Sequence, residues 1–201
     1  LLSSSLSHFH GQAKAVAETL RGGIEGTESV LLHEASRGVM ELDGPGFLTY
    51  EVGGLRYRVG HLSFFQVNRL LIGEMVKRVV GEELGGLAVD LYAGVGLFTL
   101  PLARRYERAI GVEANPATVR DLRANGKENK VECGAVHEGV EKFLSTWKGA
   151  PDLVVLDPPR AGVPGPAIEK LRRLAPARIV YLSCDPSTLA RDLAALLAAD
   201  G

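Results

Sequence analysis

The chain has 201 residues, of which 46% are hydrophobic and 23% charged, and its formal net charge is −1. This composition is typical of a globular protein with a real core, and no apolar run reaches the roughly 18 residues that a membrane span needs. The start, LLSSSLSHFH, lacks the pattern of a signal peptide. Two cysteines are too few for a disulfide framework or a four-cysteine metal site. We therefore expect a cytoplasmic protein without a metal or an iron–sulfur cluster.

Residues 1–62 are expected to form a small, partial α+β segment. Ala13–Leu20 predicts a short helix and Ser29–His33 a strand. The stretch GFLTYEVGGLRYRVG predicts a β-hairpin, because alternating apolar residues flank the turn pair Gly53-Gly54. The chain does not begin with Met, which we interpret as a start inside a longer gene product.

Residues 63–201 show a different pattern and are expected to form a second, larger domain. Apolar residues at helical spacing predict a helix from Phe64 to Val79. After a glycine-rich seam, strands and helices alternate, which predicts an α/β fold with a doubly wound, mostly parallel sheet. The chain stops directly after a helix, so the sheet is expected to be incomplete at its C-terminal end. The expected strands are Leu87–Tyr92, Ala109–Glu113, Glu132–His137, Leu153–Asp157 and Ile179–Ser183, and the expected helices are Leu97–Tyr106, Pro116–Asn125, Val140–Trp147, Pro166–Leu174 and Ser187–Ala199.

A glycine turn and an acidic residue predict a cofactor site. Gly94-x-Gly96 follows an apolar strand, and Glu113 ends the next strand about 20 residues later, the spacing expected of a carboxylate that binds ribose hydroxyls. Thr99 occupies the third glycine position of the dinucleotide fingerprint, which argues against a dinucleotide. A purely structural turn and an exposed loop carboxylate are the alternatives.

Two further strand ends carry residues that could perform chemistry. Asp157 begins the run DPPR, and Cys184 lies in the run SCDP before a predicted helix. If the two strands are neighbours, both side chains face one cleft. The helix dipole and free N–H groups at the helix start favour a thiolate, so Cys184 is a candidate nucleophile, although a free cysteine is often only a small core residue. Cys133 has no such setting, and we expect it to be structural.

Five motifs together resemble the RNA uridine-5-methyltransferases that act on tRNA and rRNA: SFFQVN, DLYAGVGLFTLPLA, GVEAN, DPPRAGV and YLSCDPSTLARDL. The resemblance runs in order from about Phe64 to Leu193 and implies a Rossmann-like methyltransferase domain that uses S-adenosylmethionine and releases S-adenosylhomocysteine. It implies that Cys184 adds to carbon 6 of a uracil in RNA, after which carbon 5 takes the methyl group. The resemblance places Gln66, Tyr92, Gly94 and Glu113 around the cofactor, with Asp157 at the uracil or at the amino acid end of the cofactor.

Phe64 would stack on the extruded base, or would be a core residue at a helix start. The sequence departs from the family where Leu97 replaces a usual Asn, and it stops before the motif that carries the family's general base, a Glu. It also lacks the N-terminal RNA-binding barrel. We therefore expect a fragment that binds cofactor and traps RNA covalently but turns over poorly. A small-molecule or protein methyltransferase on the same fold and a non-catalytic RNA-binding fragment are the alternatives.

Overall fold

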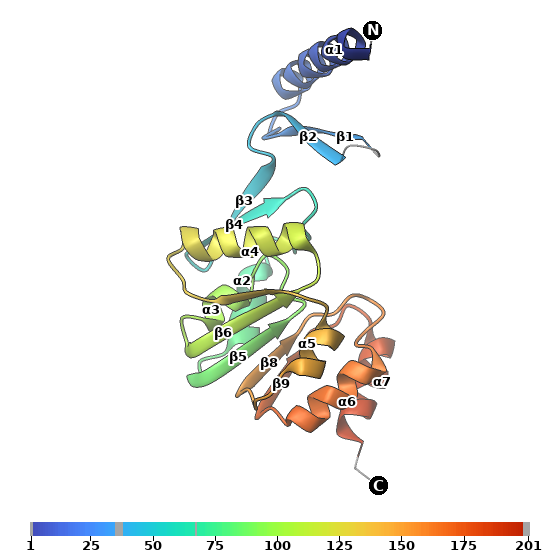
Figure 1. Cartoon of the computed structure of the whole chain (residues 1–201). Helices are drawn as coiled ribbons and strands as arrows, with labels where there is room; N and C mark the ends of the chain where they lie inside the picture. The colour runs from blue at the N-terminus through green and yellow to red at the C-terminus, as the bar shows by residue number, and fades with distance from the viewer. Residues whose placement is uncertain (1, 35–37, 67, 199–201) are drawn as a thin grey trace.

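The computed structural model describes residues 2–34, 38–66 and 68–198. Its N-terminal part consists of the helix α1 and two antiparallel hairpins, and of these the second hairpin lies next to the larger part, while α1 and the first hairpin extend away from it (Figure 1). The bidentate ion pair from Arg21 to Asp43, at 2.8 Å, ties the end of α1 to the first hairpin. The bounds are α1 Leu2–Gly23, β1 Val30–Glu34, β2 Gly38–Asp43, β3 Phe47–Val52 and β4 Leu55–Gly60.

The second hairpin confirms the sequence prediction. β3 and β4 pair from Phe47–Gly60 to Val52–Leu55. The turn residues Gly53 and Gly54 have φ of 59° and 72°, a left-handed conformation that glycine adopts without steric cost. In contrast, α1 is longer than the predicted Ala13–Leu20 helix, and the sequence analysis did not identify β2.

A five-stranded parallel sheet forms the centre of the larger part, in the order β7-β6-β5-β8-β9. This order and the alternation of strands and helices confirm the predicted doubly wound α/β fold. The strands are β5 Gly85–Leu91, β6 Tyr106–Glu113, β7 Gly134–His137, β8 Leu153–Leu156 and β9 Arg178–Tyr181. The helices are α2 Ile72–Val80, α3 Thr99–Leu102, α4 Pro116–Glu128, α5 Val140–Thr146, α6 Gly165–Leu174 and α7 Pro186–Leu197.

Helices cover both faces of this sheet (Figure 1). On one face, alternate residues of β5 and β8 pack with α2, α3 and the second hairpin in a first apolar core. On the other face, the intervening strand residues pack with α5 and α6 in a second core, and α7 packs on α6. Buried strands with apolar residues on both sides are typical of parallel sheets.

Two helices are shorter than the sequence predicted. α2 begins at Ile72 rather than Phe64, because the Asn68 side chain accepts hydrogen bonds from the N–H groups of Leu70 and Leu71 and forms a turn there. α3 spans only Thr99–Leu102, because the chain turns at Arg104 and Tyr106 already pairs with Gly85 in the sheet. Val67, inside the predicted first helix, and residues 199–201, which include the end of the predicted last helix, lie outside the described residues.

Polar side chains of α4 and of its C-cap residue Asn129 close the free edge of β4. Asn125 accepts from the Arg58 N–H at 2.7 Å and donates to the Arg58 carbonyl at 3.0 Å. Asn129 makes the same pair of bonds to Arg56, at 2.8 and 2.7 Å, and Asp121 accepts from the Gly60 N–H at 2.8 Å. The hairpin is thereby bonded to a helix of the larger part. The predicted division of the chain at residue 62 stays a prediction.

Candidate active site

The crossover helices change face between β5 and β8. The connections through α3 and α4 cover one face, and those through α5 and α6 cover the other. In such sheets ligands bind outside the carboxyl ends of the strands, at this switch point. The predicted site residues Tyr92, Glu113, Asp157 and Cys184 all lie at or just beyond the carboxyl ends of β5, β6, β8 and β9. The fold therefore brings four predicted residues from four strands to one edge of the sheet.

The loop after β5 has the backbone conformation of a close-approach turn. Tyr92, Gly94 and Gly96 have φ of 65°, 54° and 92°, and positive φ is uncommon for a residue other than glycine. Backbone strain at a residue other than glycine, here Tyr92, is enriched at functional sites. A Cβ built at Gly94 meets no atom within 4 Å, so the turn presents its bare backbone to open space. Burial raises the pKa of Tyr92 to about 12, which keeps its hydroxyl protonated at neutral pH.

Glu113 fixes this loop from the end of the neighbouring strand. Its Oε2 accepts from the Gly94 N–H at 3.1 Å, and its Oε1 accepts from the Asn115 N–H at 2.8 Å. Each carboxylate oxygen can accept two hydrogen bonds. Glu113 therefore orients the glycine turn and still has acceptor capacity for a ligand that carries hydroxyl groups.

Asp157 and Gln66 meet although they are far apart in sequence. Gln66 Nε2 lies 3.4 Å from Asp157 Oδ2, at the long end of the hydrogen-bonding range. Burial raises the pKa of Asp157 and the bond from Gln66 lowers it, and the result lies above the ordinary value. The segment before α2 thus reaches the carboxyl end of β8.

Cys184 is a free, exposed cysteine three residues beyond β9. β8 and β9 are paired neighbours, which meets the condition under which Asp157 and Cys184 were predicted to face one cleft. The expectation of free helix N–H groups was wrong for two of them. Asp185 caps α7 by accepting from the Ser187 and Thr188 N–H groups at 2.8 and 3.1 Å.

The other sequence candidates have distinct environments. Phe64 is 70% exposed and lies outside any helix, so the alternative of a core residue at a helix start was wrong. Leu97 is buried in the first apolar core. Cys133 is half-buried just before β7, at the amino-terminal edge of the sheet, and burial raises the pKa of its thiol.

The sequence analysis missed two buried carboxylates near the site. Asp90 in β5 is 1% exposed and accepts from Thr99 Oγ1 at 2.6 Å, while its Oδ1 has no hydrogen-bond partner in the described part of the chain. Burial raises its pKa to about 7. Asp192 in α7 is fully buried and bonds to the loop that follows β8. An acidic residue on the sheet-facing side of a helix, as in LARDL, is the signal that could have revealed Asp192.

No helix among residues 2–34, 38–66 and 68–198 combines the length and apolar character that crossing a bilayer requires. Within the same ranges, no group of three or more His, Cys, Asp and Glu side chains is arranged to hold a metal ion.

Family models match most of the chain. The TRM5/TYW2 methyltransferase domain matches residues 52–162, and the tRNA (Uracil-5-)-methyltransferase family matches residues 144–200. A Thermotoga maritima protein described as an uncharacterized RNA methyltransferase is 36% identical over 160 residues, which cover 78% of this chain and 36% of the relative. A Nitratidesulfovibrio vulgaris protein with the same description is 40% identical over 166 residues, which cover 77% and 35%.

Solved structures also resemble this chain in fold. The Pyrococcus abyssi tRNA (uracil-54, C5)-methyltransferase, in complex with S-adenosyl-L-homocysteine, superposes with a TM-score of 0.69 at 30% identity over 77% of this chain and 38% of that chain. Trm5b from the same organism superposes with a TM-score of 0.59 at 18% identity over 94% and 59%, a likeness of fold alone.

The fold is that of the Rossmann-like, S-adenosylmethionine-dependent methyltransferases. The TRM5/TYW2 domain matches more than half of the chain, and the chain belongs to this family of RNA methyltransferases. The comparisons confirm the family resemblance that the sequence motifs indicated. The chain spans about a third of the length of the curated relatives that it matches.

Proposed function

We propose that this chain is the catalytic part of an enzyme that methylates carbon 5 of a uridine in tRNA or rRNA through a covalent bond to Cys184. One observation carries the proposal: the exposed Cys184 lies beyond β9, and Asp157 directly follows the adjacent strand β8. The family match of residues 144–200 includes both residues, and its description names a uracil-5 activity. The relative from Pyrococcus abyssi, whose description names the same chemistry, adds further support.

The residues at the ends of β5 and β6 fit S-adenosylmethionine as the cofactor. Open space beside Gly94 leaves room for a ligand against the backbone, and Glu113 has acceptor capacity for the ribose hydroxyls. When bound, the cofactor supplies a methyl group activated by a sulfonium. Gln66 and Tyr92 would line the cofactor, and Asp157 would contact its amino acid end or the uracil.

Cys184 would supply the nucleophile that uracil needs. Its thiolate forms a bond to carbon 6, and the electrons of the C5–C6 double bond move toward the oxygen on carbon 4, so that carbon 5 becomes nucleophilic and takes the methyl group. Loss of the carbon 5 proton to a base and departure of the Cys184 sulfur then restore the ring. The exposed Phe64 ring would stack on the base once it leaves its neighbours in the RNA.

The test uses full-length protein, cofactor and RNA that contains 5-fluorouridine. After methylation, fluorine cannot leave carbon 5 as a proton does, so the Cys184–carbon 6 bond persists as a protein–RNA adduct that survives denaturation. We expect this adduct with the wild-type protein, none with Cys184→Ala, and an unchanged yield with Cys133→Ala. Cys133 is the matched control, because it lies at the opposite edge of the sheet.

Each failure points to a different function. Cofactor binding without any adduct, across RNA from several sources, would favour a small-molecule or protein methyltransferase. RNA binding that depends on neither cofactor nor Cys184 would favour a non-catalytic fragment. Normal methylation by Cys184→Ala would contradict the covalent mechanism.

A further inference from the structure

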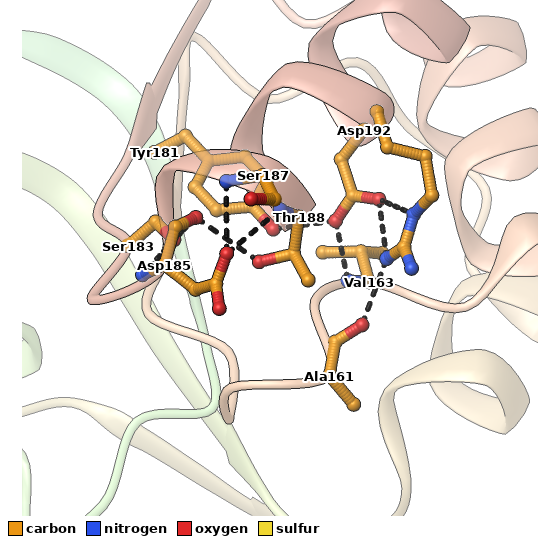
Figure 2. A network of polar contacts seen from close by, with 9 residues as sticks. Ala161, Val163, Tyr181, Ser183, Asp185, Ser187, Thr188 and Asp192 are labelled. Carbon is orange, nitrogen blue, oxygen red and sulfur yellow. Dashed lines mark hydrogen bonds and ion pairs between the residues drawn. The ribbon is translucent and has the colours of Figure 1, made fainter.

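A buried carboxylate joins the two loops that carry Asp157 and Cys184. Asp192 in α7 is 0% exposed, and a buried charge is costly unless it is paired and hydrogen-bonded. Its Oδ2 accepts from the Tyr181 hydroxyl at 2.6 Å and from the Val163 N–H at 2.7 Å, and its Oδ1 accepts from Arg191 Nε at 2.8 Å (Figure 2). Three donors from three segments therefore converge on one side chain.

Two of the donors lie near the two strand ends, Val163 in the loop after β8 and Tyr181 at the end of β9. Val163 belongs to the irregular segment between β8 and α6, which begins with Asp157. Tyr181 is the last residue of β9, three positions before Cys184, and Arg191 Nη2 also donates to the Ala161 carbonyl at 2.7 Å. α7 itself starts immediately after the Cys184 loop. α7 thus begins two residues after Cys184 and, about two turns later, bonds through Asp192 to the Val163 N–H in the loop that follows Asp157 (Figure 2).

The loop lies so close to this carboxylate that it requires a glycine. Gly162 has φ of 80°, and a Cβ at this position would overlap Asp192 Oδ2 and Arg191 Nη2. The Pro159 carbonyl accepts from the Gly162 N–H at 2.8 Å, which tightens the turn. The Asp192 side chain, in the motif LARDL, therefore explains why the motif DPPRAGV has a glycine at position 162.

The charge states match these contacts. Burial alone would raise the pKa of Asp192, but the hydrogen bonds from Tyr181, from the Val163 N–H and from Arg191 outweigh it, and the pKa lies below its usual value. Burial, followed by the bond to Asp192, raises the pKa of Tyr181. At neutral pH the carboxylate is ionised and the phenol keeps the proton that it donates.

We infer that Asp192, with Tyr181, is a positioning residue that fixes the Asp157 loop relative to the Cys184 loop during catalysis. The inference rests on the proposed function. Both loops must act on one uracil ring, and a misplacement of about 1 Å can cost about 100-fold in rate. Among the described contacts, Asp192 and Arg191 make the polar bonds that tie the loop beyond Asp157 to α7.

The test compares full-length wild-type protein with Tyr181→Phe and Asp192→Asn. Single-turnover formation of the 5-fluorouridine adduct is followed at saturating RNA and cofactor, together with the dissociation constant of the cofactor. We expect the rate to fall about 10- to 100-fold in Tyr181→Phe and further in Asp192→Asn, whose amide group would face donors. The dissociation constant of the cofactor should rise by a smaller factor than the rate falls, because Glu113 lies on the far side of β5 and keeps its contacts.

The matched control is Tyr106→Phe, which removes the hydroxyl of a buried tyrosine at the amino end of β6 and should leave the rate unchanged. A purely structural defect lowers the fraction of protein that reacts, whereas loss of positioning lowers the rate of the molecules that do react. The positioning role alone would be overturned if Tyr181→Phe and Asp192→Asn formed the adduct at the wild-type rate, whether with full or with reduced final yield. Absence of an adduct in the wild-type protein would overturn the proposed function and the inference together.

Discussion

Glu113 performs two tasks at the end of β6, since it orients the glycine turn and, in the proposed site, binds the ribose. In Glu113→Gln one oxygen becomes an NH2 group that faces a backbone N–H or a hydroxyl. We expect the affinity for S-adenosylmethionine to fall about 10- to 100-fold, because hydrogen bonds to charged groups contribute about 1.5 to 3 kcal/mol. Isothermal titration calorimetry measures this change.

The control is Glu107→Gln, which alters an exposed carboxylate at the opposite end of the same strand. Equal affinities for wild type and Glu113→Gln would remove Glu113 from the cofactor site.

Single residues could be predicted where a local motif carries them. Cys184 and Asp157 lie in strand-end motifs, and their placement follows once the strands are neighbours. The position of Asp192 in LARDL could suggest a buried carboxylate, but its bonds could not be predicted, because the partners Val163 and Tyr181 come from other segments. The sequence around Cys184 also did not show that Asp185 would occupy the first N–H groups of α7.

At the scale of elements, α4 stabilises the hairpin through Asn125. This side chain is fully buried and bonds to both backbone groups of Arg58 and to the Val95 carbonyl. Asn125→Ala leaves these groups without partners, and we expect a loss of about 2 to 4 kcal/mol in the free energy of unfolding. Urea denaturation followed by circular dichroism measures it.

Arg120→Ala, an exposed change on the same helix, should stay within about 0.5 kcal/mol of the wild type. A similarly small effect of Asn125→Ala would show that the edge of β4 needs no side chain of α4.

Strongly patterned elements were predictable, and elements decided by tertiary contacts were not. The hairpin β3–β4 and the strands β5 and β8 carry clear local signals. α3 is short because Tyr106 pairs in the sheet, and α2 starts late because Asn68 forms a turn. Helical spacing alone indicates neither effect, because both depend on where the chain is held by distant residues or by a side-chain cap.

At the scale of the whole molecule, the buried Asp90 makes stability depend on pH. The pKa of Asp90 is about 7 in the folded protein, compared with 3.8 in the unfolded chain. As pH rises, the unfolded chain therefore loses this proton first. Stability from this group is fully present below pH 3.8 and is lost as pH rises through 7. In Asp90→Asn the amide oxygen can still accept the hydrogen bond from Thr99, but the side chain does not titrate. The variant therefore does not lose this stability as pH rises.

The stability gained by Asp90→Asn over wild type should therefore grow by roughly 3 kcal/mol between pH 5 and pH 8, since each pKa unit is about 1.4 kcal/mol. Denaturant titrations of both proteins at the two pH values measure this growth. A constant difference between them would contradict a raised pKa for Asp90.

The parallel architecture and the family were predictable, because the strand-end motifs occur in order along the chain. The cytoplasmic location and the RNA target remain predictions.

The side chains of α4 also determine where the small hairpin sheet can grow. Four residues of helix rise about 6 Å, close to the roughly 6.6 Å of two strand residues, so Asn125 and Asn129 can imitate the rungs of a neighbouring strand. With that side of β4 occupied, an additional strand can join the hairpin only beside β3. Any sheet built onto this hairpin by another part of the protein must therefore extend in one direction, away from α4.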